Sequence, residues 1–377
     1  MRRRVLCRIV PPHILRNIAE RGDDEDRERA HIALEGAAQA RGQREAIAHG
    51  GGLLVVPTGE KQRTIYDARH RRELPGRLVR SEGDRRTSDV AVNEAYDGCG
   101  RTYDFFRRVL GRNSIDDRGL RLDSTVHYGN NYDNAEWNGR QMIYGDGDGK
   151  YFRRFTSSLE VIAHELAHGV TQHTARLGYG HQSGALSEHF SDVFGILVKQ
   201  YARRQTAQRS DWLVGAELLT ERVDGDAIRS MKAPGTAYDD RILGSDPQPA
   251  HMKHFVKTEA DNGGVHVNSG IPNHAFYRVA TLLGGRAWEV AGKIWYDALV
   301  HRLTPRARFQ HCADATWESA GALFGAGSAP QEAVLAGWKA VGIDVSAAIV
   351  AGGPRLHVRE EETFEPPAPA AELPIFV

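Results

Sequence analysis

Residues 164–168 read His-Glu-Leu-Ala-His, and this pentapeptide decides how the rest of the chain is interpreted. Two histidines four positions apart project from the same face of a helix, so His164 and His168 can bind one metal ion. A carboxylate from elsewhere in the chain would complete the three protein ligands of a catalytic zinc, which leaves one position open to water. Glu165 follows the first histidine and is placed to take a proton from that water. The pattern predicts a zinc hydrolase.

The residues around this motif favour a buried helix. Four apolar side chains recur at helical spacing around the histidines: Val161, Ile162, Leu166 and Val170. An amphipathic surface helix with two solvated histidines is the alternative, but apolar residues on both sides of the motif favour a helix buried in a core. We therefore predict that the motif helix is packed in the protein core.

A second helix is expected to supply the third metal ligand. Residues 183–184, Ser-Gly, predict a turn, and apolar periodicity predicts a helix over about 185–201. Glu188 and Asp192 lie four positions apart and hence on one face of that helix. Glu188 is the expected ligand. Asp192 is expected to accept a hydrogen bond from the far nitrogen of a ligand histidine, which fixes the orientation of the ring.

The chain resembles the thermolysin family of zinc metalloendopeptidases, and most of all its protealysin-like branch, which has a short N-terminal propeptide. The matching stretches occur in family order and at family spacing: 134–139, 144–149, 164–174, 183–195, 226–231 and 261–270. The resemblance implies an α+β fold of two lobes. One lobe would be rich in strands and the other helical, with the zinc site in the cleft between them.

The resemblance implies a catalytic or metal-binding role for each residue of the metal site. His164, His168 and Glu188 match the zinc ligands, and Glu165 matches the general base that activates the attacking water. One catalytic Zn²⁺ per chain is implied. A dry site should raise the pKa of Glu165, so that it accepts a proton and later passes it to the leaving nitrogen.

The resemblance also implies how the charge on the reacting carbonyl is stabilised. His266 and Tyr179 match the two donors to this oxyanion, and Asp261 matches the carboxylate that orients His266. Attack on an amide places negative charge on the former carbonyl oxygen, and one preplaced donor typically contributes about 3 kcal/mol.

Substrate is expected to bind along a strand edge. Asn134 and Ala135 match residues that pair with a peptide backbone, and Arg229 matches the guanidinium that holds a substrate carbonyl. Four residues match an apolar pocket beside the metal: Phe152, Phe155, Val161 and Ile228. The implied reaction is hydrolysis of protein or peptide substrates on the amino side of bulky hydrophobic residues.

The N-terminal stretch beginning at Cys7 resembles the protealysin-like propeptide. This implies a zymogen whose inhibitory propeptide, residues 1–62, is removed autocatalytically between about 40 and 62. Pro11 and Pro12 have fixed backbone geometry, and we expect them to occupy substrate subsites without presenting a cleavable bond.

The three cysteines, Cys7, Cys99 and Cys312, are odd in number and widely spaced, which argues against a disulfide framework. Cys7 has two open interpretations. It is either a thiolate ligand that displaces water from zinc, or a buried apolar contact within the propeptide. Cys99 and Cys312 are expected to be structural.

The rest of the chain is expected to form three parts. Residues 63–172 would be the N-terminal catalytic lobe, with short strands, a helix over about 90–110 and the metal-binding helix. Residues 173–345 would be the helical C-terminal lobe. Residues 346–377 are predicted to be a disordered tail, because they are too polar to build a core.

Composition limits the function classes. Lys+Arg and Asp+Glu both total 49, so no global charge favours nucleic acid or an anionic membrane surface. No apolar run of 18 residues predicts a transmembrane helix. The first apolar run is broken by Arg8 and is too short for a secretory signal, so cytoplasmic synthesis is expected, and any export would follow a non-classical route. We expect a monomer.

Calcium binding is expected to differ from the family pattern. Residues 146–149, Asp-Gly-Asp-Gly, suggest a calcium loop, but Ser157 stands where an EF-hand requires glutamate. We interpret them as a turn after an edge strand at about 140–144. Two residues match the family's paired calcium site: Glu160 and Asp211. Lys199 replaces a bridging carboxylate there, so this site is expected to be lost. A separate calcium site stays open, on two partial matches: Thr220 and Asp226.

Two other functions are kept as alternatives. One is a catalytically silent pseudoprotease whose zinc fold serves binding or adhesion. The combination of Glu165, Tyr179 and His266 argues against it. The other is a zinc hydrolase such as an aminopeptidase, for which we find no motif that would capture a free amino terminus.

Overall fold

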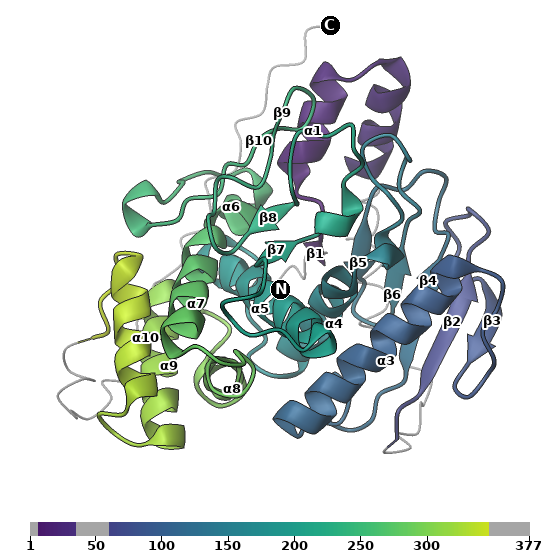
Figure 1. Ribbon diagram of the computed structural model, residues 1–377. Coiled ribbons are helices and arrows are strands. Elements are labelled where there is room, and N and C mark those ends of the chain that lie inside the picture. Colours follow the sequence, from purple (N-terminus) through teal and green to yellow (C-terminus); the bar gives the residue numbers. More distant parts are fainter. Residues whose placement is uncertain (1–6, 35–59, 347–377) are drawn as a thin grey trace, which may run out of the picture. The chain divides into compact units, whose positions relative to one another are not determined.

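A six-stranded mixed sheet forms one side of the catalytic lobe (Figure 1). The computed structural model describes residues 7–34 and 60–346. The chain divides into two units, Met1–Val345 and Ser346–Val377, and the fold described below is that of the first. The expected processing region lies largely outside the described residues, as does the expected tail apart from Ser346.

The strands follow the spatial order β1-β5-β6-β4-β2-β3. Their bounds are β1 (Cys7–Arg8), β2 (Arg63–Asp67), β3 (Arg77–Ser81), β4 (Leu122–Val126), β5 (Ala135–Trp137) and β6 (Met142–Tyr144). The neighbours β2, β4 and β6 run parallel, whereas β1, β5 and β3 pair antiparallel with their partners. Strand β1 comes from the N-terminal segment and covers the otherwise open side of β5.

The long helix α3 (Val90–Leu110) has the bounds expected from the sequence. Asp89 caps its first turn by accepting a hydrogen bond from the Val92 nitrogen, and Gly111 ends it in the left-handed conformation. The helix packs against β2 and β4, and against the metal-motif helix α4 (Leu159–His173).

The strand expected at about 140–144 is confirmed as β6, but its expected place at the edge of the sheet is wrong. Strand β6 lies between β5 and β4, so it is an interior strand. All three of its residues are buried, because both faces of the strand are covered. Strand β5 would lie at the edge of the sheet only without β1, which pairs with it here.

Helices make up the second lobe. They are α5 (His181–Arg203), α6 (Asp261–Asn268), α7 (Gly270–Leu283), α8 (Ala291–Asp297), α9 (Phe309–Phe324) and α10 (Ala329–Ala340), with a π-helical turn at Ala298–Arg302 after α8. Short 3-10 turns occur at Phe155–Ser157, Ala216–Leu218 and Met252–His254, and two small ribbons are formed by β7 (Leu213–Val214) with β8 (Arg229–Ser230), and β9 (Asp239–Asp240) with β10 (Gly244–Ser245). Helix α4 packs on β5 and α3 as well as on α5, so it joins the two lobes (Figure 1). Among the described helices, none is long and apolar enough to cross a membrane.

The turn expected at residues 183–184 is wrong, because both residues lie inside α5. Gly184 is needed for packing: a Cβ atom there would lie 2.5 Å from the Val265 side chain. The Ser183 hydroxyl donates to the carbonyl oxygens of Gly178 and Gly180 at 2.8 and 3.0 Å, and so helps to anchor the start of the helix.

The N-terminal segment forms two helices. Helix α1 (Pro12–Arg21) ends before Gly22, and residues 24–34 are helical again. The run of charged residues at 21–29 predicts one solvated helix, and this prediction is wrong. The chain instead bends at Gly22, and Asp26 is buried against Lys150 and Tyr151.

Lys199 lies in a buried polar cluster with Glu160 and Asp211, the two residues expected to match a paired calcium site. Its ammonium nitrogen donates to the Leu213 carbonyl oxygen at 2.6 Å and lies 2.9 Å from Asp211 and 3.5 Å from Glu160. The side chains of Lys199 and Glu160 are both fully buried. A fixed positive charge among these carboxylates opposes the binding of a cation.

Replacing Lys199 with methionine should lower the free energy of unfolding by about 3–5 kcal/mol, because Glu160 would lose its nearest buried counter-charge. Urea unfolding of the full-length chain measures this loss. Lys257 is exposed, and Lys257→Met is the matched control, expected within about 0.5 kcal/mol of the unmutated chain. A loss of less than about 1 kcal/mol for Lys199→Met would show that this contact does not hold the cluster.

Candidate metal centre and peptide-binding cleft

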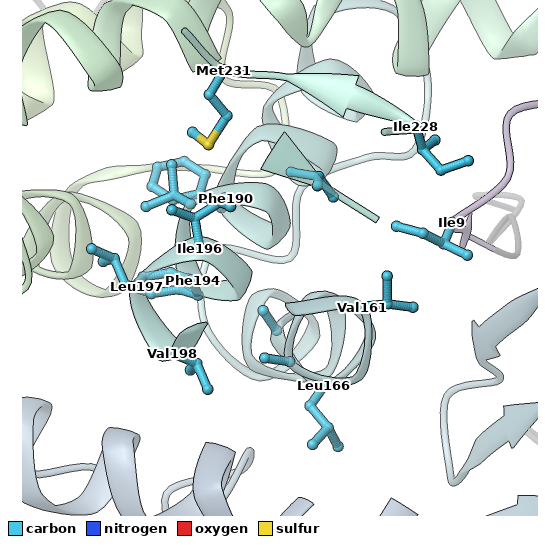
Figure 2. Packing of buried hydrophobic residues seen from close by; sticks show 14 of the residues in the cluster. Ile9, Val161, Leu166, Phe190, Phe194, Ile196, Leu197, Val198, Ile228 and Met231 are labelled. Carbon is cyan, nitrogen blue, oxygen red and sulfur yellow. The ribbon is translucent and has the colours of Figure 1, made fainter. Parts of the chain in front are cut away.

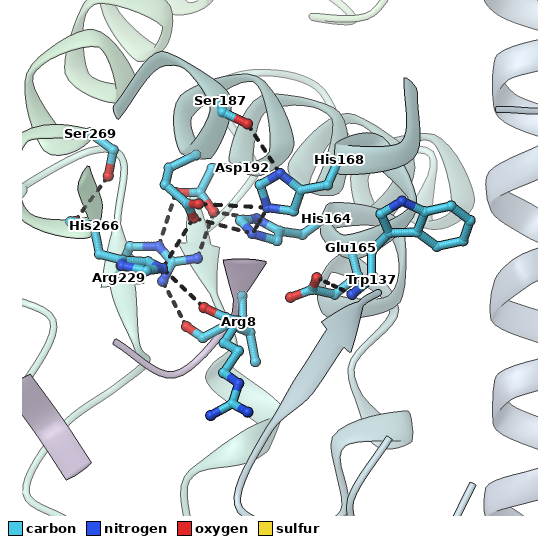
Figure 3. A network of polar contacts seen from close by, with 12 residues as sticks. Arg8, Trp137, His164, Glu165, His168, Ser187, Asp192, Arg229, His266 and Ser269 are labelled. Atoms are coloured by element: carbon cyan, nitrogen blue, oxygen red, sulfur yellow. Dashed lines mark hydrogen bonds and ion pairs between the residues drawn. The ribbon is translucent and has the colours of Figure 1, made fainter. Parts of the chain in front are cut away.

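Three side chains from α4 and α5 meet in a buried cluster (Figure 3). The Nε2 atoms of His164 and His168 are 3.0 Å apart, and they lie 3.6 and 3.7 Å from the carboxylate oxygens of Glu188. Donor atoms at such separations can surround one ion with bonds of about 2.0–2.2 Å. Two imidazole nitrogens and one carboxylate oxygen are the donor set of a catalytic zinc, so the residues present fit this metal.

Glycines allow the two helices to approach closely enough for this cluster to form. A Cβ atom on Gly195 of α5 would lie 2.6 Å from the Glu160 carbonyl oxygen and 3.5 Å from the His164 Cβ atom. Any larger residue would push α5 away from α4. Glu188 would then move away from the histidines.

In both histidines, the ring nitrogen that faces away from the cluster, Nδ1, contacts a polar side chain. The Nδ1 atom of His164 donates to Asp192 at 2.8 Å, and Nδ1 of His168 lies 3.3 Å from the Ser187 hydroxyl. Asp192 was expected in this position. It also accepts two hydrogen bonds from Arg229, at 2.8 and 2.9 Å, and one from the Asn273 amide at 2.8 Å. Sequence reasoning missed Asn273, since no local pattern marks it as a partner.

Burial and neighbouring charges shift the pKa values of the cluster before any metal charge is added. Burial alone lowers the pKa of His164, but Asp192 outweighs it and raises this pKa to about 9. Burial lowers the pKa of His168 to about 3. At neutral pH one ring is therefore protonated and the other is not, which permits a hydrogen bond between the two Nε2 atoms at 3.0 Å.

Glu165 faces the same space. Its Oε2 atom accepts a hydrogen bond from the Trp137 backbone nitrogen at 3.0 Å (Figure 3). Its Oε1 atom is buried and has no hydrogen-bond partner among the described residues. Burial raises the pKa of this carboxyl group to about 8. A carboxyl with one oxygen fixed and the other available is suited to proton transfer.

Tyr179 and His266 lie on the other side of Glu188. The Tyr179 hydroxyl donates to Glu188 at 2.5 Å and lies 3.4 Å from Nε2 of His266. Asp261 accepts hydrogen bonds from Nδ1 and from the backbone nitrogen of His266, at 2.7 and 2.8 Å. Residues 261–264 all have positive φ angles, and two of them are glycines that adopt this conformation without strain. This turn lets one carboxylate reach both atoms of His266.

Residues 8–10 lie in the cleft as an extended peptide. The Ile9 nitrogen donates to the Ala135 carbonyl oxygen at 3.3 Å, and the Val10 nitrogen donates to the Asn134 side chain at 3.1 Å. In return, His266 donates to the Arg8 carbonyl oxygen and Arg229 to the Ile9 carbonyl oxygen, both at 3.0 Å (Figure 3). Four of the five residues expected to touch the substrate or its carbonyl oxygen therefore contact the backbone of this segment: Asn134, Ala135, Arg229 and His266.

The Ile9 side chain is fully buried at this place. Figure 2 shows it facing Val161 and Ile228, two residues of the expected apolar pocket, and all three belong to one hydrophobic cluster. Phe152 and Phe155 of the same expected pocket are also fully buried.

The direct contacts with the cleft are made by residues 8–10. Pro11 and Pro12 come next, where Pro11 precedes α1 and Pro12 is its first residue. Proline suits the first position of a helix, since no partner is needed there for its missing N–H. Cys7 pairs with Trp137 in β1, but its side chain lies outside the described residues, and both interpretations of Cys7 stay open.

Asp192→Asn should weaken Zn²⁺ binding about 10–100-fold, because the His164 ring loses the carboxylate that orients it and raises its basicity. Competition with a chromogenic chelator measures the affinity. His301 is exposed, and His301→Ala is the control for removing an unrelated polar side chain. An unchanged affinity in Asp192→Asn would contradict this role.

Comparison with known families accounts for nearly the whole described chain. Residues 54–172 match the catalytic domain of thermolysin metallopeptidases, residues 175–343 match their α-helical domain, and residues 7–35 match the protealysin propeptide.

Two bacterial proteases are similar along almost their full length. An extracellular metalloprotease of Pectobacterium carotovorum subsp. carotovorum is 48% identical over 92% of this chain and 99% of its own. The protease PrtS of Photorhabdus sp. (strain Az29) is 46% identical over 89% of this chain and 92% of its own.

A solved structure, the precursor of protealysin from Serratia proteamaculans, superposes with a TM-score of 0.82. It is 48% identical and covers 89% of this chain and 99% of its own. This match confirms the expected α+β fold with a helical C-terminal domain. The chain belongs to the thermolysin family of metallopeptidases and carries the propeptide of the protealysin branch.

Proposed function

We propose that this metalloprotease precursor removes its own N-terminal segment and then acts as an endopeptidase that cuts on the amino side of bulky hydrophobic residues. One observation carries the proposal. Residues 8–10 are held in the cleft by their backbone atoms, as an internal stretch of a polypeptide substrate would be. An aminopeptidase would bind a free amino terminus instead.

His164, His168 and Glu188 are the proposed zinc ligands, as the family and the geometry of the donor atoms support. When bound, zinc supplies a Lewis acid that polarises the scissile carbonyl and lowers the pKa of a coordinated water. Asp192 and Ser187 would keep the two histidine rings turned toward the ion.

Glu165 is the proposed general base. Its available oxygen points into the site, and burial raises its pKa to about 8, so the carboxyl can both accept and return a proton near neutral pH. It would take the proton of the attacking water and deliver it to the leaving amine.

His266 and Tyr179 are the proposed donors to the oxyanion. His266 already donates to a peptide carbonyl, that of Arg8, at 3.0 Å. Burial alone lowers the pKa of His266, but Asp261 and Glu188 outweigh it and raise this pKa to about 9, so the ring can donate from both nitrogens at neutral pH. The Tyr179 hydroxyl lies 3.4 Å from this ring and can reach the same oxygen.

The preference for a hydrophobic residue rests on Ile9. Its nitrogen belongs to the peptide bond whose carbonyl is held by His266, and its side chain faces Val161 and Ile228. A substrate in the same register would place a bulky apolar side chain directly after the bond to be cut. Arg229 would hold the carbonyl of that residue, as it holds the Ile9 carbonyl.

The propeptide is the proposed intramolecular inhibitor because it fills the cleft, and processing is proposed between about residues 40 and 62. The mature enzyme would then consist of lobes 63–172 and 173–345. One relative is named an extracellular metalloprotease, and we propose that this protein also acts outside the cell. We further propose one zinc in the catalytic centre and no calcium at the Lys199 cluster.

Purified full-length chain supplied with zinc should lose about its first 40–62 residues and gain endopeptidase activity, whereas Glu165→Ala should stay intact. A general base contributes about 10²–10⁴-fold to the rate, so the endopeptidase activity of Glu165→Ala should be lower by at least about 10²-fold. N-terminal mass and cleavage of a hydrophobic peptide with a blocked amino terminus are followed together, with and without a chelator.

Equal processing in both chains would mean that a contaminating protease cuts the precursor. A prosegment-deleted form that binds zinc but leaves the blocked peptide intact would support the pseudoprotease alternative instead.

Asp26→Ala should shorten the lag before activity appears. Asp26 is buried in the propeptide and accepts hydrogen bonds from Lys150, at 2.6 Å, and Tyr151, at 2.8 Å, so its loss should weaken propeptide docking by about 1–3 kcal/mol. Asp24→Ala is the matched control, since Asp24 is exposed and pairs only with Arg27 among the described residues. Equal lags in the two variants would show that the Asp26 contact does not hold the propeptide.

A further inference from the structure

A second group of metal-binding side chains lies in the N-terminal lobe and shares no residue with the centre on α4 and α5. It consists of His70, His127 and Asp146. The Nδ1 atom of His127 lies 2.9 Å from both carboxylate oxygens of Asp146, and Nδ1 of His70 lies 3.4 Å from one of them. Each side chain therefore directs a donor atom toward the same small volume.

The sheet brings these residues together. Strands β2, β4 and β6 are parallel neighbours, so their carboxyl ends meet at one edge of the sheet. His70 follows β2, His127 follows β4, and Asp146 follows β6, each within three residues of the strand end. The His70 backbone nitrogen also donates to the His127 carbonyl oxygen at 2.8 Å, which fixes the two histidines beside each other.

The arrangement behind His127 matches that behind the catalytic ligand His164. The other ring nitrogen of His127, Nε2, lies 2.8 Å from an Asp89 oxygen. Metal-ligating histidines typically donate this second N–H to a carboxylate, which orients the ring. The other Asp89 oxygen caps helix α3, so the position of this carboxylate is fixed by the fold.

An ion pair between a protonated His127 and its two aspartates is the simpler explanation of these contacts. It accounts for His127 but not for His70, whose Nδ1 atom approaches the same carboxylate from a separate turn. A separation of 3.4 Å is long for a hydrogen bond. It matches two donor atoms on a tetrahedral ion with bonds of about 2.0–2.1 Å.

We propose that His70, His127 and Asp146 bind a divalent transition-metal ion of the zinc class, as a structural site separate from the catalytic centre. Imidazole nitrogens favour such ions over calcium or magnesium. The His70 side chain is 59% exposed, that of Asp146 27% and that of His127 20%, so an ion can enter from solvent and water can complete its coordination.

The nearby Arg154 side chain does not occupy the proposed metal site. Arg154 borders the same surface depression, but it is engaged by Glu94 at 2.6 and 2.7 Å. A bound ion would join three separate connections at the carboxyl edge of the sheet and, through His127 and Asp89, the start of α3. The expected effect is stabilisation of the lobe.

Equilibrium dialysis against buffered micromolar free Zn²⁺, followed by metal analysis, tests the site. The full-length chain carrying Glu165→Ala serves as the reference, because it is expected to remain uncleaved. Two ions per chain are expected in the reference, and one ion when His70→Ala or Asp146→Asn is added. The matched control His301→Ala, which removes another exposed histidine, should keep two.

His168→Ala in the same background should disable the catalytic centre and keep the proposed ion. Zinc beyond the first equivalent should raise the melting temperature of the reference but not that of His70→Ala. Circular dichroism checks that each variant is folded, and Asp146→Asn, which preserves side-chain volume, replaces any variant that is not. A reference chain that never exceeds one ion, or a second ion retained in His70→Ala and Asp146→Asn, would overturn the proposal.

Discussion

The close packing of α4 against α5 is the constraint on which the site depends. The two histidines come from one helix and the glutamate from the other, so their donor atoms converge only if the helix backbones approach nearly to contact. Gly195 permits this approach, whereas Gly184 lets α5 pack against Val265, next to His266. Glu165 of the same helix α4 is buried beside β5, and this burial raises its pKa. Metal geometry thus follows from how two helices pack, and the acid–base chemistry follows from the burial of α4.

Asp192 connects this centre with the peptide-binding side of the cleft. One carboxylate accepts hydrogen bonds from His164, Arg229 and Asn273. His164 faces the metal site, and Arg229 holds the carbonyl of Ile9. The Asp192 carboxylate is fully buried and is shared by Arg229 and His164. A displacement of the bound peptide at Arg229 therefore changes the position of the His164 ring as well. The Asp192 carboxylate therefore sets both the position of a bound peptide and the orientation of the proposed metal ligand His164.

Much of this architecture follows from local sequence patterns. The bounds of α3 and the spacing of His164, His168 and Glu188 could be predicted, because helical periodicity and ligand spacing are short-range features. Features that are decided by tertiary contacts could not be predicted from local patterns. Ser183-Gly184 looks like a turn, yet the glycine is required for packing inside α5. The interior place of β6 and the meeting of His70 with Asp146 depend on strands that pair across long stretches of chain, which no local pattern encodes.

The pairing of β1 with β5 has a consequence for the life of the protein before processing. A strand with one unpaired side is a template on which extended segments of other chains can add, which is a route to aggregation. In the precursor this side of β5 is covered by the protein's own residues 7–8, paired with Trp137 and Glu136. The propeptide therefore covers an aggregation-prone edge of the sheet in the precursor. Under the proposed function, removal of the propeptide would expose the same edge for the binding of substrate polypeptides.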